Sequence, residues 1–318
     1  MKYNRLGNTG ITVSEIGFGV LTMGGSQLNL SVEEGASLLK YALSRGFSFI
    51  DTAQYYDCYE YIYEAIKDSD YRPVICSKCL GRTYIEMEAA VNEALTELHL
   101  DKIDIFLLHE VRNGSDFDDR RGAWECLKDF KARGIIDAIG ISTHHVDVTE
   151  RAADIEELDV IFPLINYASL GIRKGDGFGT CEEMEEAILK ASKKGKGVFL
   201  MKAFGGGNLT GTYQKALDYS RSVKGADSVM IGFGSTDEID QMLSYLDGTM
   251  DKDFQPDVSK KIIRIDQGDC EGCGACKERC PNHAIYWNEN GLADVNRNLC
   301  LTCGYCAPVC PVRAIILL

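Results

Sequence analysis

The sequence has little of three things: long apolar runs, a leading hydrophobic signal and positive charge. No apolar run in its 318 residues approaches the ~20 residues that a membrane-spanning helix needs. The N-terminal stretch MKYNRLGNTGITVSEIGFG contains no basic segment followed by an apolar one, so we expect no secretory signal and a cytoplasmic location. No membrane partner is expected.

The shortage of positive charge bears on the choice of partners. The chain carries 34 Lys and Arg against 48 Asp and Glu, a formal net charge of -14. Nucleic acids and anionic lipids are bound by clustered Lys and Arg, so no nucleic-acid partner is expected. Residues 263–318 hold five Lys and Arg and six Asp and Glu, so almost all the negative charge lies on the first 262 residues. The sequence thus divides into an acidic body and a nearly neutral tail.

Cysteine, in contrast, is abundant. Eight of the 13 cysteines fall in two short repeats in the tail, and the other five are scattered through a body large enough to need no disulfides. In a reducing cytoplasm, clustered thiolates indicate zinc or an iron-sulfur cluster.

The body alternates short apolar runs with segments of helical period. The runs are IGFGVL, FSFIDTA, PVICSKC, IDIFLLH, AIGISTH, DVIFPLINY, GVFLMKAF and SVMIGFG. Alternation of this kind predicts a parallel sheet, and eight units predict an α/β fold closed into a (β/α)8, or TIM, barrel. Ser31 and Glu34 have the spacing of a capping box that begins a helix. The preceding stretch YNRLGNTGITVSEI predicts a hairpin that closes the bottom of the barrel.

Polar side chains follow three neighbouring strands of this barrel. Asp51 and Tyr56 follow the second strand, Lys78 ends the third and His109 ends the fourth. Active sites of such barrels form at the carboxyl ends of the strands, so these four side chains are expected at one mouth. The alternative is a set of structural polar residues under the loops.

These residues are where the chain resembles the aldo-keto reductase family. The family carries an Asp-Thr-Ala-x-x-Tyr motif after strand two, a Lys ending strand three and a His ending strand four. The resemblance implies carbonyl reduction or alcohol oxidation with Tyr56 as general acid and base. Lys78 is expected to lower the pKa of the Tyr56 phenol, with Asp51 holding Lys78 and His109 orienting the substrate oxygen.

The resemblance also implies a nicotinamide cofactor, NADP or NAD. Ser142 stands at a family position, Thr143 replaces the family's Asn, Phe162 falls near the family's Gln, and Met201 replaces a stacking aromatic residue. The Arg or Lys expected near Gly234 for a 2'-phosphate is missing, which leaves the choice of nucleotide open. The expected nucleotide contacts are Ser142, Thr143, Asn166, Met201, Gly205, Gly206, Gly207, Gly232, Ser235 and Thr236.

Each tail repeat has the pattern C-x2-C-x2-C-x3-C-P, that of bacterial two-cluster ferredoxins. In that pattern the fourth cysteine of each repeat ligates the other cluster. We therefore expect two 4Fe-4S clusters in an α+β ferredoxin-like domain, with zinc as the alternative. The predicted ligands are Cys270, Cys273, Cys276 and Cys310 for cluster 1, and Cys300, Cys303, Cys306 and Cys280 for cluster 2.

Together these features predict a barrel over 1–250, a linker over 251–262 and a ferredoxin-like domain over 263–318. The leading hypothesis is an iron-sulfur aldo-keto reductase that acts on a small carbonyl or alcohol, with clusters that carry electrons in a cytoplasm low in oxygen. One alternative is a ferredoxin-driven oxidoreductase, in which the clusters rather than NAD(P)H supply electrons to a substrate or a redox partner protein. Another is an electron-transfer or scaffold protein on a retired barrel.

Overall fold

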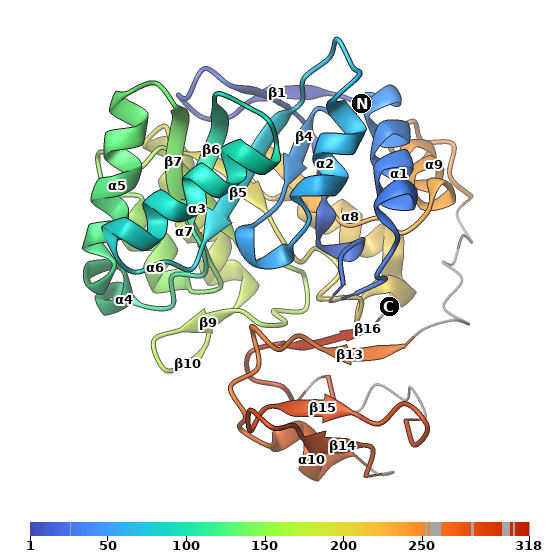
Figure 1. Cartoon of the computed structure of the whole chain (residues 1–318). Helices are drawn as coiled ribbons and strands as arrows, with labels where there is room; N and C mark the ends of the chain where they lie inside the picture. Colours follow the sequence, from blue (N-terminus) through green and yellow to red (C-terminus); the bar gives the residue numbers. More distant parts are fainter. Residues whose placement is uncertain are drawn as a thin grey trace.

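The body of the chain is a closed parallel barrel (Figure 1). The computed structural model describes residues 1–25, 27–251, 254, 262–280, 283–300, 306–307 and 309–317. Around the barrel the strands run β11-β12-β3-β4-β5-β6-β7-β8, and the predicted (β/α)8 fold is confirmed. The barrel strands are β3 (Ile16–Gly19), β4 (Phe49–Asp51), β5 (Val74–Cys79), β6 (Ile103–Leu108), β7 (Ile136–Thr143), β8 (Val160–Pro163), β11 (Gly197–Leu200) and β12 (Ser228–Ile231).

Helices surround the barrel and bury one face each against it. The helix α1 (Val32–Ser44) begins at the predicted capping box, because the Ser31 side chain accepts from the Glu34 amide and the Glu34 carboxylate accepts from the Ser31 amide. The other helices of the body are α2 (Tyr59–Ile66), α3 (Tyr84–Glu97), α4 (Gly114–Asp119), α5 (Arg121–Ala132), α6 (Val146–Ala152), α7 (Cys181–Lys193), α8 (Tyr213–Ser222) and α9 (Thr236–Leu246), with 3-10 turns η1 (Val20–Thr22), η2 (Gln54–Tyr56) and η3 (Thr210–Thr212).

Two antiparallel hairpins lie outside the barrel sheet. The predicted N-terminal hairpin is β1 (Tyr3–Arg5) with β2 (Thr12–Ser14). Its Leu6 and Val13 are fully buried against the side chains that fill the barrel, so the hairpin closes the end opposite the mouth. A second hairpin, β9 (Arg173–Lys174) with β10 (Gly177–Phe178), was not predicted and lies in the connection after β8.

The tail forms a smaller body with its own apolar cluster. Strand β13 (Ile263–Ile265) pairs with β16 (Ile315–Leu317), and β14 (Ile285–Trp287) pairs with β15 (Ala293–Val295). The short helix α10 (Ala275–Arg279) follows the first cysteines. In Figure 1 the tail lies below the mouth of the barrel, with β13 and β16 nearest to it. Most of the predicted linker falls outside the described residues.

None of the helices in the described part of the chain combines the length and the apolar character needed to cross a membrane.

Candidate active site

The four predicted side chains lie at the mouth of the barrel. Asp51 is the last residue of β4, Lys78 belongs to β5, and His109 directly follows β6. Tyr56 ends the 3-10 turn η2 after β4. Neighbouring parallel strands place their carboxyl ends side by side, which brings residues from three separate parts of the sequence together.

Asp51 and Lys78 form a buried ion pair. Lys78 Nζ donates to Asp51 Oδ1 at 2.7 Å and to the Thr52 carbonyl at 2.8 Å. The two side chains are 7% and 1% exposed, so the pair is closed to solvent. Burial raises the pKa of the Asp51 carboxyl, and the adjacent Lys78 ammonium offsets part of that rise. The pair is a rigid base for the residues above it.

Tyr56 lies against both Lys78 and His109. Lys78 Nζ is 4.6 Å from the centre of the Tyr56 ring, and the Tyr56 and His109 rings meet edge to face with centroids 5.7 Å apart. Burial raises the pKa of Tyr56 well above its ordinary value, and the carboxylates of Asp51, Asp269 and Asp266 raise it further.

The expectation that Lys78 lowers the pKa of Tyr56 is therefore corrected. Burial and the carboxylates of Asp51, Asp269 and Asp266 outweigh the effect of the Lys78 ammonium, so the net shift of the Tyr56 pKa is upward. The phenol stays protonated, which is the form that donates a proton to a carbonyl oxygen.

His109 is a neutral imidazole, and one of its ring nitrogens has no hydrogen-bond partner among the described residues. Burial lowers its pKa well below the ordinary value, and the charges of Lys78 and Arg120 lower it further. Its Nδ1 atom is buried and has no hydrogen-bond partner in the protein. Buried polar atoms are almost always paired, so an unpaired nitrogen next to Tyr56 indicates a place for a ligand.

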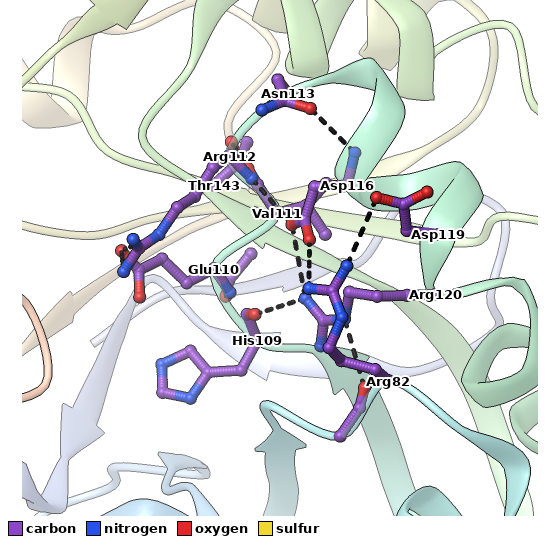
Figure 2. Close-up of polar contacts among 12 residues, drawn as sticks. Arg82, His109, Glu110, Val111, Arg112, Asn113, Asp116, Asp119, Arg120 and Thr143 are labelled. Carbon is purple, nitrogen blue, oxygen red and sulfur yellow. Dashed lines mark hydrogen bonds and ion pairs between the residues drawn. The ribbon is translucent and has the colours of Figure 1, made fainter.

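The main chain around His109 is fixed by a buried arginine on the other side of the loop (Figure 2). Arg120 is 2% exposed, and its guanidinium donates to three carbonyl oxygens, those of His109 at 2.8 Å, Cys79 at 2.9 Å and Gly81 at 3.2 Å. Asp116 lies 3.8 Å from the same guanidinium. Arg120 thus ties the ends of β5 and β6 together behind the site.

Glu110 and Arg112 form a second charged pair beside His109. Glu110 adopts a left-handed backbone conformation with φ of 54°, an uncommon choice for a residue with a side chain. The pair is held by Arg112 Nε, which donates to the Glu110 carboxylate at 3.1 Å. Burial raises the pKa of Glu110 to about 7, with a further contribution from Asp269. Sequence patterns gave no signal for this pair.

Several residues expected to hold the nicotinamide use their polar atoms inside the protein. The Ser142 hydroxyl accepts from the Glu110 amide at 2.8 Å. Thr143 is fully buried, donates to the Val111 carbonyl at 2.6 Å and accepts from the His145 amide at 3.0 Å. These hydroxyls hold the loop after β6.

Asn166 and Phe162 are also structural in these contacts. Asn166 is fully buried, and its side chain exchanges two hydrogen bonds of 2.9 Å with the main chain of Leu170. Phe162 stacks on Phe199 with centroids 4.2 Å apart. Met201, partly buried, packs at the edge of this apolar interior.

The glycines expected to bind the nucleotide phosphates differ in their structural roles. Gly205, Gly206 and Gly207 all have positive φ, between 57° and 85°, a conformation that favours glycine. A side chain at Gly232 would collide with Thr22 Oγ1 at 1.9 Å, so this glycine serves close packing.

The start of α9 is closed by its own residues. Ser235 is the N-cap and accepts from the Glu238 amide at 3.3 Å, while exposed Thr236 is the first helical residue. The Glu238 carboxylate accepts from the Gly234 amide at 2.7 Å, where a phosphate of a nucleotide was expected.

Several cysteines of the tail lie near one another. All twelve described cysteines are free, and Cys303 lies outside the described residues. Burial raises the pKa of the Cys276 thiol to about 11, and the nearby Cys310, Cys270 and Cys273 thiols add to that rise. Burial likewise raises the pKa of Cys306 to about 12, with Cys276, Cys300 and Cys280 nearby.

These thiol sets fit an iron-sulfur cubane, which needs several thiolates around one small volume. Among the described residues, no three His, Cys, Asp or Glu side chains converge closely enough to hold a single metal ion.

Comparison with known proteins identifies both parts of the chain. The model of the aldo/keto reductase family matches residues 15–246, most of the chain. The chain belongs to the aldo/keto reductase family. The tail, residues 263–318, matches a 4Fe-4S dicluster domain.

Solved structures support the same fold for this aldo-keto reductase. A putative aldo-keto reductase from Pseudomonas aeruginosa superposes with a TM-score of 0.66 at 22% identity, over 78% of this chain and 95% of the other. An aldo-keto reductase from Bacillus halodurans gives a TM-score of 0.64 at 18% identity, over 79% and 93% of the two chains.

The matches to curated relatives cover a smaller share of each chain. An uncharacterized oxidoreductase of Bacillus subtilis is 22% identical over 217 residues, 64% of this chain and 68% of its own length. L-galactose dehydrogenase of Arabidopsis thaliana is 26% identical over 188 residues, 54% and 58% of the two chains. The matches span 50% to 68% of the length of the curated relatives.

The iron-sulfur tail of this aldo-keto reductase adds residues to the barrel mouth that sequence reasoning missed. Asp266 and Asp269 lie close enough to Tyr56 and Glu110 to raise the pKa values of both. The Lys202 charge acts on both tail carboxylates in the opposite direction. No spacing in the sequence links residue 56 to residue 269, so only the fold could reveal this contact.

Proposed function

We propose that this protein is an oxidoreductase of the iron-sulfur aldo-keto reductase type that interconverts a small carbonyl compound and its alcohol. The observation that carries the proposal is the buried, unpaired Nδ1 of His109 beside the Tyr56 ring, above the Asp51–Lys78 ion pair. This arrangement is suited to binding a carbonyl oxygen and protonating it.

In this proposal Tyr56 is the general acid and base, and His109 orients the substrate oxygen. A neutral imidazole can donate one hydrogen bond without competing for the proton that Tyr56 transfers. The protonated phenol, favoured by burial and by the carboxylates around it, donates the proton in carbonyl reduction. Asp51 and Lys78 fix the floor against which the Tyr56 ring rests.

A nicotinamide cofactor, NADP or NAD, is part of the proposal. When bound it supplies the hydride that reduces the carbonyl carbon. The Gly205 amide donates to the Lys202 carbonyl at 2.7 Å, so the amides of Gly206 and Gly207 are the ones proposed to bind the pyrophosphate. Ser142 belongs to β7 and Met201 directly follows β11, the strands expected to flank the nicotinamide ring.

The substrate is expected to be small and polar. Several side chains around the mouth are charged or ionisable, namely Glu110, Arg112, His144, Lys202 and Asp269. Such a lining favours a hydroxylated carbonyl compound over an apolar one. Two relatives are named L-galactose dehydrogenase and D-arabinose 1-dehydrogenase, which supports the same class.

The proposed clusters are ligated by the two cysteine sets. Cluster 1 takes Cys270, Cys273, Cys276 and Cys310, and cluster 2 takes Cys300, Cys303, Cys306 and Cys280. Bound clusters supply one-electron steps to the protein.

The decisive test is Tyr56→Phe, which removes only the proton donor. With anaerobically prepared holoprotein and glyceraldehyde plus NADPH or NADH, we expect kcat/KM to fall by ~10²–10⁴-fold with unchanged iron content. The matched control is Tyr63→Phe, a tyrosine on α2 that stacks on His99, which should retain activity. Turnover by Tyr56→Phe at the control rate would sink the proposal.

Two contacts favour a second candidate, a ferredoxin-driven oxidoreductase. The Glu238 carboxylate accepts the hydrogen bond of the Gly234 amide. The carbonyl oxygen of Ile315, from the tail, would lie 3.7 Å from a Cβ atom added at Gly206. Both contacts crowd the expected nucleotide phosphates. Anaerobic titration separates the candidates, because bleaching of the clusters by NADPH or NADH alone supports the first, and bleaching only by a reduced protein partner supports the second.

A further inference from the structure

Two contacts between the modules involve residues next to ligands of one cluster. Arg112, from the loop after β6, lies 3.7 Å from the carboxylate of Glu271, the residue after Cys270. Arg173, from β9, donates to the carbonyl of Pro311 at 3.2 Å, the residue after Cys310. Cys270 and Cys310 belong to the same predicted set, that of cluster 1.

The stretch before Cys270 is also packed on the mouth. The Gly268 backbone rests against the Tyr55 ring so closely that a side chain there would collide with it at 2.8 Å. Arg264 donates to the carbonyl of Gly25, in the loop after η1, at 3.1 Å. The main chain from 264 to 271 thus crosses the mouth beside the turn η2, which holds Tyr56. This segment includes Cys270, a predicted ligand of cluster 1.

We propose that cluster 1 is the cluster coupled to the barrel's substrate site, and that Arg112 is the residue that couples them. The inference rests on the proposed function for the identity of that site. Arg112 holds a carboxylate from each module, Glu110 at 3.0 Å and Glu271 at 3.7 Å. One guanidinium therefore connects the residue next to His109 with the residue next to Cys270.

Two contacts beside the other cysteine set lie within the tail. Cys280 Sγ accepts from the Ala284 amide at 3.3 Å, and the Ala307 carbonyl beside Cys306 accepts from Arg313 at 2.7 Å. The choice of cluster 1 is carried by the barrel arginines Arg112 and Arg173, which reach the neighbours of Cys270 and Cys310.

The coupling has a predicted sign. Reduction adds a negative charge to a cluster, and a nearby positive charge favours the reduced form. Removing the charge of Arg112 should therefore lower the potential of cluster 1 and leave that of cluster 2 in place. Coupling between two sites is reciprocal, so reduction of cluster 1 must also change the charge environment of Glu110 and His109.

The experiment is an anaerobic redox titration of the holoprotein, followed by EPR, without substrate or nucleotide. We expect Arg112→Gln and Arg173→Gln to move the same one of the two cluster transitions to lower potential. The matched control is Arg151→Gln, which removes the same charge from an exposed ion pair with Asp118 on the flank of the barrel, and should move neither. The moved transition should disappear in Cys273→Ala and persist in Cys303→Ala.

Several results would overturn the inference: no shift in Arg112→Gln, equal shifts of both clusters, a shift matched by Arg151→Gln, or a moved transition that is lost in Cys303→Ala instead. The titration needs no turnover, so it can fail while Tyr56 proves catalytic, and it can succeed while Tyr56→Phe remains active. The two proposals are thus tested separately.

Discussion

Glu110 shows how one residue can make stability depend on pH. Its folded-state pKa of about 7 lies above the ordinary 4.5, so between these values the folded protein holds a proton that the unfolded chain has released. The stabilisation is complete below pH 4.5 and is lost as the pH rises through 7. Arg112, Asp269 and Asp266 are the charged groups that act on this carboxyl.

We therefore expect Glu110→Gln to gain stability relative to the native protein as the pH rises from 5 to 8, by up to roughly 3 kcal/mol. Guanidinium unfolding of both proteins at the two pH values measures the difference. Glu60→Gln, at an exposed position of α2, is the control. Its unfolding free energy should differ from that of the native protein by the same amount at pH 5 and at pH 8. A pH-independent effect of Glu110→Gln would contradict the raised pKa.

Lys78 gives a second prediction at the same scale. Lys78→Met leaves the Asp51 carboxylate buried without its partner, which is expected to destabilise the barrel by about 3–5 kcal/mol. The double variant Asp51→Asn/Lys78→Met removes both charges and should recover part of that loss, measured by denaturant unfolding. A single variant no less stable than the double one would show that the pair is not buried as a unit.

At this scale the sequence predicted some groups and missed others for a physical reason. Asp51, Tyr56, Lys78 and His109 follow recognisable strands, so the order of strand ends was enough to group them. The pKa of Tyr56 was predicted in the wrong direction, because burial of the phenol and the Asp51 carboxylate raise it, and Asp269 and Asp266, more than 200 positions away, add to the rise. A motif records neighbours along the chain, whereas a pKa depends on neighbours in space.

At the scale of the elements, one buried side chain ties the loop after β6 to the end of β5. Arg120 stands between α4 and α5 and donates to carbonyls that end β5 and β6. Arg120→Met removes the donor to the His109 and Gly81 carbonyls and leaves the Cys79 carbonyl with the His109 amide alone, so we expect a loss of about 3 kcal/mol in stability. Because one of these carbonyls is that of His109, kcat should fall as well.

The matched control is Arg121→Met, an exposed neighbour at the start of α5, which should change neither quantity. Arg120→Lys keeps the charge but supplies no planar fork, so it should restore little of kcat. Full activity in Arg120→Met would show that the loop holds His109 without this arginine.

The elements themselves were largely readable from the sequence, for local reasons. Apolar runs and a capping box at Ser31 depend on residues close together in the chain, and these predictions are confirmed. The hairpin β9–β10 was not predicted, because its strands have two residues each and show no alternation of apolar and polar residues. Its Arg173 nevertheless supplies a contact to the tail.

At the scale of the whole molecule, the tail packs on the mouth of the barrel and has a core of its own. Its apolar cluster includes Cys276, Cys306 and Cys310, three of the residues that are proposed to hold the clusters. The barrel has a separate and far larger core. The two modules therefore draw their stability from different sources.

Removal of iron should consequently unfold the tail and leave the barrel folded. Without metal, buried cysteine side chains lose the bonds that fix them, and a tail of this size has little other core. After anaerobic chelation, hydrogen exchange should rise throughout the tail and in the mouth segments around Tyr55, Arg112 and Arg173, while β4 to β7 stay protected. If the mouth segments kept their protection while the tail lost its own, the tail would not be covering the site.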